Sequence, residues 1–79
     1  MDVTATLKTN YRKIAAVFIQ ATLNAQNACE REEWVSAETK AKNAFVGMNV
    51  LSLHLIDAIG LEDFRTFKLE IDNIIIDSI

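Results

Sequence analysis

His54 and Asp57 are the two residues of the chain whose types and spacing come closest to a chemical site. On a helix, residues three positions apart share a face, so this pair could ligate one metal ion or act as an acid and a base. A metal site needs a third and usually a fourth ligand, and the chain has no second His, no HExxH motif and no Glu-x-x-His motif. We therefore interpret His54 as a partly exposed structural or interface residue, and we predict no metal-binding, cofactor-binding or catalytic residues.

The densest acidic cluster consists of Glu30, Glu32 and Glu33, followed by Glu38. Carboxylates of this kind can bind a divalent cation. Helical carboxylate sites draw their ligands from two or more helices that face inward, whereas this cluster lies where the chain is expected to turn. We interpret the cluster as a solvated turn.

Nucleophilic catalysis has no better support in the sequence. Cys29 follows Ala25 and Ala28 at the end of an apolar stripe, with no base close to it, and we interpret its thiol as a small buried hydrophobic group. A Ser or Thr nucleophile needs a positioned base and an oxyanion hole. Gly47 and Gly60 are the only glycines, which excludes a Gly-x-Ser-x-Gly motif and a glycine-rich phosphate loop. The sequence thus predicts a protein that is not an enzyme.

Composition excludes several further classes. The 79 residues are 51% hydrophobic with a formal net charge of -3, which argues against disorder, and a pI of about 4.9 makes direct binding to nucleic acid unexpected. The longest apolar run, residues 14–19, is far shorter than the roughly 20 residues that cross a bilayer. No secretion signal opens the chain, and a lone Cys suits a reducing compartment. We expect one cytoplasmic domain over residues 1–79.

Apolar side chains spaced alternately by four and three residues predict a first helix over about residues 3–32. This stripe comprises Leu7, Tyr11, Ile14, Phe18, Ala21, Ala25 and Ala28. Ala16, Ile19 and Leu23 add a second apolar face, which is typical of a helix that is enclosed on two sides.

A second helix is expected to follow a turn at residues 30–36, with Ser36 as its N-cap and Gly60 as its end. Its stripe comprises Ala37, Ala41, Ala44, Met48, Leu51, Leu55 and Ala58. Because an interior glycine destabilises a helix by about 1 kcal/mol relative to Ala, Gly47 indicates the close approach of a neighbouring helix.

Residues 61–79 allow two interpretations. As a helix, they place apolar side chains on one face, namely Phe64, Phe67, Ile71, Ile74 and Ile75. As strands, residues 67–71 alternate apolar and polar side chains, and a turn at residues 72–73 would lead into three isoleucines. We predict the helix, because a lone two-stranded hairpin is marginally stable. The expected fold is all-α, a hairpin of two long helices with a shorter C-terminal helix; the alternative is an α+β fold with a C-terminal β-hairpin.

A lone copy of such a chain buries only about 60% of its surface on folding, and the last segment is too short to cover both apolar faces of the first helix. We therefore expect a homodimer in which two hairpins pair into a four-helix-type bundle. Residues 1–29 are net basic and residues 57–79 net acidic, so the start of the chain could attract the end of itself or of a copy. Trp34 either folds over the end of the bundle or is exposed as an anchor for a partner.

Together these features predict a non-enzymatic helical protein–protein interaction module, a homodimeric adaptor or inhibitor that acts on another, unidentified protein. The alternative is a bundle that holds a small molecule or a metal between helices, with Tyr11, Trp34 or His54 at the site. The candidate interface residues are Ala16, Ile19, Leu23, Trp34, Gly47 and His54.

Overall fold

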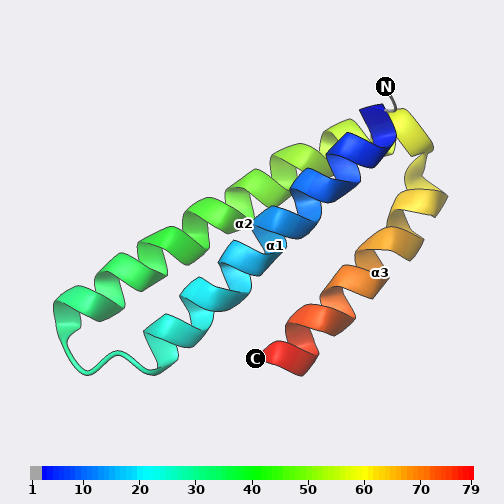
Figure 1. Ribbon diagram of the computed structural model, residues 1–79. Coiled ribbons are helices and arrows are strands. Elements are labelled where there is room, and N and C mark those ends of the chain that lie inside the picture. The colour runs from blue at the N-terminus through cyan, green and yellow to red at the C-terminus, as the bar shows by residue number, and fades with distance from the viewer. Residues whose placement is uncertain (1–2) are drawn as a thin grey trace.

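A computed structural model describes residues 3–79, and this part of the chain consists of three helices without a strand. The helices are α1 (Val3–Gln26), α2 (Arg31–Ile59) and α3 (Leu61–Ser78). Figure 1 shows α1 and α2 as an antiparallel hairpin and α3 beside the half of it that contains the start of α1. The all-α prediction and the helical interpretation of residues 61–79 are confirmed, and the β-hairpin alternative is wrong.

The turn of the hairpin lies earlier than predicted. α1 ends at Gln26 rather than near residue 32, and α2 begins at Arg31, so Ser36 lies inside a helix and caps nothing. The physical reason is that Glu32 and Glu33 occupy the first turn of α2, where negative charges interact favourably with the positive end of the helix dipole. The acidic cluster therefore helps to start the helix that it was expected to precede.

Gly60 ends α2 as predicted, and it does so in a backbone conformation with φ 87° and ψ 160° that only glycine adopts readily. Its backbone N–H donates to the Ile56 carbonyl at 2.8 Å, and its own carbonyl accepts from the Phe64 N–H at 3.1 Å. One residue thus joins α2 to α3 and reverses the chain.

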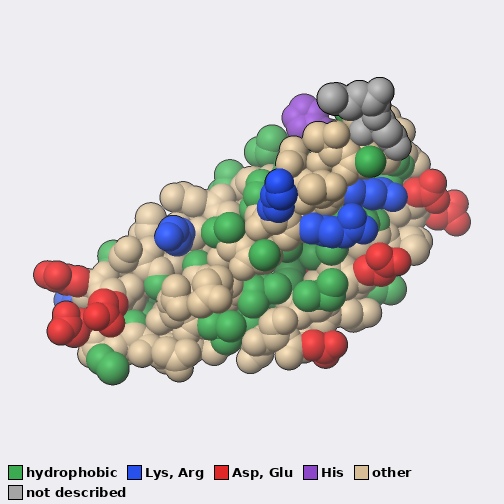
Figure 2. Space-filling model, in the orientation of Figure 1, with side chains coloured by type: hydrophobic (Ala, Val, Ile, Leu, Met, Phe, Trp, Pro, Cys, Tyr) green, Lys and Arg blue, Asp and Glu red, His purple; other side chains and the backbone are tan. Residues whose placement is uncertain are grey.

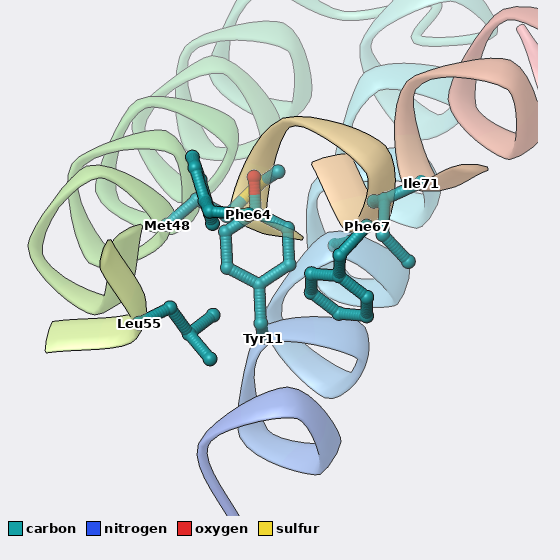
Figure 3. Close-up of a cluster of buried hydrophobic side chains, with 7 residues drawn as sticks. Tyr11, Met48, Leu55, Phe64, Phe67 and Ile71 are labelled. Atoms are coloured by element: carbon teal, nitrogen blue, oxygen red, sulfur yellow. The ribbon is translucent and has the colours of Figure 1, made fainter. Parts of the chain in front are cut away.

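The core lies where all three helices meet (Figure 3). Tyr11 of α1 is 2% exposed, and its ring meets those of Phe64 and Phe67 edge-on, with centroids 6.3 and 5.5 Å apart. The core cluster comprises Tyr11, Ala15, Met48, Leu55, Phe64, Phe67 and Ile71. These contacts hold α3 against the hairpin and confirm the burial predicted for Tyr11.

α3 covers only part of the hairpin. Its 18 residues span about 27 Å, against about 43 Å for the 29 residues of α2. Ile74 was predicted on the buried face of α3 but is 54% exposed, because α3 contacts the hairpin along a narrow stripe centred on Phe64, Phe67 and Ile71. None of the three helices is long and apolar enough to cross a membrane within residues 3–79.

Candidate interaction surface

The structure does not assemble a chemical site around His54 and Asp57. Both side chains are exposed on α2. Among residues 3–79, no three His, Cys, Asp or Glu side chains lie close enough together to hold a metal ion. Cys29, predicted to be buried, is instead exposed in the turn between α1 and α2, because α1 ends before reaching it.

The residues of the alternative ligand site are also kept apart. Tyr11 belongs to the core beside α3, whereas His54 is exposed and Trp34 lies near the start of α2 at the far end of the hairpin. Burial raises the pKa of the Tyr11 hydroxyl, and the negative charge of Asp72 raises it further. Trp34 is 48% exposed, so about half of its side chain is accessible at that end of the hairpin.

Gly47, Ala37 and Ala44 of the second helix face the other helix of the same chain, whereas Ala58, predicted on the same stripe, is exposed. Ala37 and Ala44 are buried, and a Cβ added to Gly47 would meet Ile14 of α1. The close approach of a neighbouring helix that Gly47 predicts thus occurs within the hairpin of one chain.

The second apolar face of α1 remains partly open. Ala16 is exposed, and Ile19 and Leu23 are half-buried. The α3 residues of the core pack at Tyr11 and Ala15, nearer to the start of the helix. The short last segment therefore leaves this face incompletely covered, as the sequence indicated.

A groove that the sequence analysis did not identify opens where α3 ends. Phe18 and Phe45 line a hollow beside Ile75 of α3, and the same two rings line a second hollow further along the hairpin. Their centroids are 6.2 Å apart and their planes are inclined by 42°. We define the open groove as this second hollow, of about 520 Å³, which is lined by Phe18, Thr22, Glu38, Ala41, Lys42, Phe45 and Val46.

A second apolar feature runs along the side of α2 that faces away from α1. Val46, Val50 and Leu53 follow one another at spacings of four and three, and they are 58%, 49% and 69% exposed. We call these three residues the outer stripe; Val46, at its start, also lines the open groove. The helical spacing of these residues is visible in the sequence. The outer stripe was not predicted, because the stripe that contains Ala37, Ala41 and Ala44 is the stronger pattern on the same helix.

Charge is concentrated at the two ends of the molecule. Figure 2 shows acidic side chains at the end with the α1–α2 turn, a group of Lys and Arg side chains toward the other end with further acidic side chains beside it, and hydrophobic side chains between the two ends. Lys8 and Arg12 lie over the Phe67 ring, at 5.5 and 5.1 Å from its centroid, in a hollow that they share with Asp63 and Glu70. The basic start of the chain therefore lies beside its own acidic last third.

No protein-family model matches the chain, and comparisons with curated proteins and with solved structures find none that is similar.

Proposed function

We propose that this protein is a non-enzymatic helical interaction module that binds an amphipathic helix of another protein in the open groove. The observation that carries the proposal is that α3 stops at Phe18 and Phe45, while the groove that it occupies continues beyond them. Phe45 is 53% exposed and Val46 58% exposed. Exposed apolar side chains gathered in one hollow are typical of a protein-binding surface.

The packing of α3 supports an expectation about the chemistry of the partner. α3 places Phe64, Phe67 and Ile71, spaced by three and four residues, against the hairpin. The part of α2 that lines the groove, from Glu38 to Val46, is about 12 Å long, which accommodates about two turns of a partner helix. We therefore expect a partner helix with large apolar residues at positions i, i+3 or i+4, and i+7.

The charges that flank the groove favour neither an acidic nor a basic partner. Glu38 and Lys42 both line the groove, whose other walls are apolar or uncharged. Since the attraction would rest mainly on apolar burial, binding should persist at high salt.

Photo-crosslinking tests this proposal in cells. A benzophenone amino acid replaces Phe45 in one variant and Asn73, which is exposed on α3 away from the groove, in the matched control. The position-45 variant should crosslink to a segment of another protein that has the helical apolar spacing, and a synthetic copy of that segment should bind the purified chain. Phe45→Glu should weaken this binding about tenfold or more, with unchanged circular dichroism.

Three results would contradict the proposal. The first is equal crosslinking at positions 45 and 73, and the second is crosslinking of position 45 only to copies of this chain. The third is binding of the synthetic segment that Phe45→Glu leaves unchanged, because the segment would then lie outside the groove.

A further inference from the structure

We infer that a second copy of this chain binds along the outer stripe, so that the two α2 helices pack antiparallel about a two-fold axis that passes between Asn49 and Val50. The outer stripe shares Val46 with the open groove, and Lys42 lines that groove as well, but the inference does not rest on the proposed partner helix. It also differs from the homodimer expected from the sequence, whose close-packing residue Gly47 faces Ile14 of its own chain.

The register follows from the positions of the exposed side chains. In an antiparallel pair with the axis between residues 49 and 50, Val46 of one copy lies opposite Leu53 of the other, and the reverse contact is its symmetry mate. Val50 lies close to its own counterpart. The three exposed side chains of the outer stripe are thus covered by one another.

The same register pairs opposite charges. Lys42 lies four residues before Val46, and Asp57 four residues after Leu53, and both are exposed. When Val46 and Leu53 oppose each other, Lys42 of each copy is therefore level with Asp57 of the other. The contact between the two α2 helices, which we call the seam, therefore has an apolar centre with a complementary ion pair at each end. Neither a parallel pair of helices nor an antiparallel pair shifted by one turn gives this arrangement.

The other helices leave this face free. α1 packs on the side of α2 that carries Ala44, Met48 and Leu55, which are 7%, 6% and 0% exposed. Residues 46, 50 and 53 lie roughly opposite to that side on a helical projection. A second α2 can therefore approach without displacing α1.

Disulfide crosslinking tests both the dimer and its register, in a Cys29→Ser background that removes the exposed native thiol. The double variant V46C/L53C should form an interchain disulfide under mild oxidation, because these positions oppose each other. The single variants V46C and L53C should not, since each Cys would lie about 10 Å along the helix from its symmetry mate, too far for a disulfide. Single variants that form the interchain disulfide as readily as V46C/L53C would overturn the antiparallel register.

Charge exchange and sedimentation complete the test. The wild-type chain should sediment at twice its mass of 8.9 kDa. K42E and D57K should each weaken association about tenfold, because each places like charges together at both ends of the seam, whereas K42E/D57K should restore it. A wild-type chain that stays monomeric at about 100 μM, a concentration on the order of the Kd of a weak interface, would overturn the inference. A K42E/D57K variant that associates no better than K42E or D57K alone would also overturn it. Crosslinking from position 45 tests the groove and the interchain disulfide tests the dimer, so failure of one proposal is distinguishable from failure of the other.

Discussion

Gly47 of α2 lies against Ile14 of α1 at a distance that leaves room for one methyl group. A Cβ built on Gly47 would be 3.4 Å from Ile14 Cδ1 and 3.6 Å from Cγ2, which is ordinary contact with the flexible end of a side chain. The glycine therefore lies close to α1 without being required by the packing.

Gly47→Ala should consequently stabilise the protein. Ala is favoured over Gly in a helix interior by about 1 kcal/mol, and part of this gain should appear in the free energy of unfolding measured by urea titration. Gly47→Leu is the matched control, because its longer side chain would meet Ile14 and force α1 away, at a loss of roughly 1–3 kcal/mol. Destabilisation by Gly47→Ala would show that the two backbones are closer than the structure has them.

Gly60→Ala should have the opposite effect. The Gly60 backbone has φ 87° and ψ 160°, and no atom lies within 4 Å of an added Cβ, so any loss would come from backbone strain and not from collision. A residue other than Gly in this region is destabilised by about 1–3 kcal/mol. Urea titration should show a loss of this size, and an unchanged midpoint would mean that the α2–α3 junction adopts another conformation in solution.

The helices and their inward stripes could be predicted from the sequence because helical periodicity depends on residues close together in the chain. Tyr11, Phe64, Phe67 and Ile71 were expected on apolar faces and are all buried. Gly60 was expected to end α2, and it does. These features require no knowledge of how the helices are arranged in space.

Features that depend on the arrangement were missed. Ile74 shares the apolar half of α3, but its burial depends on how wide a strip of that helix the hairpin touches. The open groove at Phe18 and Phe45 exists because α3 lies parallel to the hairpin and ends beside those rings. α2 carries two apolar stripes, and periodicity alone does not decide which of them α1 covers.

The stability of the protein should fall in alkaline solution through Tyr11. Burial, reinforced by the charge of Asp72, raises the pKa of the Tyr11 hydroxyl above its ordinary value of 10.0. The folded state therefore holds the proton more tightly than the unfolded state, so this contribution is complete below pH 10.0 and is lost as the pH rises through the folded-state pKa.

Comparison with Tyr11→Phe isolates this effect from the titration of lysines. Below pH 9, which is about one unit under the Tyr pKa, the difference in unfolding free energy between the two proteins should be constant. Above it, the wild type should lose stability faster than Tyr11→Phe. Parallel pH profiles for the two proteins would mean that the hydroxyl is as well solvated in the folded state as in the unfolded one.

Phe67 should be the main anchor of α3, because its ring contacts Tyr11 at 5.5 Å on one side and lies under Lys8 and Arg12 as well. Phe67→Ala should reduce the free energy of unfolding by about 3–5 kcal/mol, the usual effect of removing a buried aromatic ring. Phe67→Leu keeps most of the apolar volume but loses the edge-on ring contact and both cation–π contacts, and it should reduce stability by about 1–2 kcal/mol.

Ile76→Ala provides the control for this series, since Ile76 lies on the same helix and is 72% exposed. Its effect should be within about 0.5 kcal/mol, as for other surface positions, when all the variants are measured by urea titration at low protein concentration to avoid self-association. If Ile76→Ala destabilises as much as Phe67→Ala, the face of α3 that carries Phe67 is not the one that anchors it. If Phe67→Leu matches the wild type instead, Phe67 acts through apolar volume alone, and the cations above its ring contribute nothing to holding α3 in place.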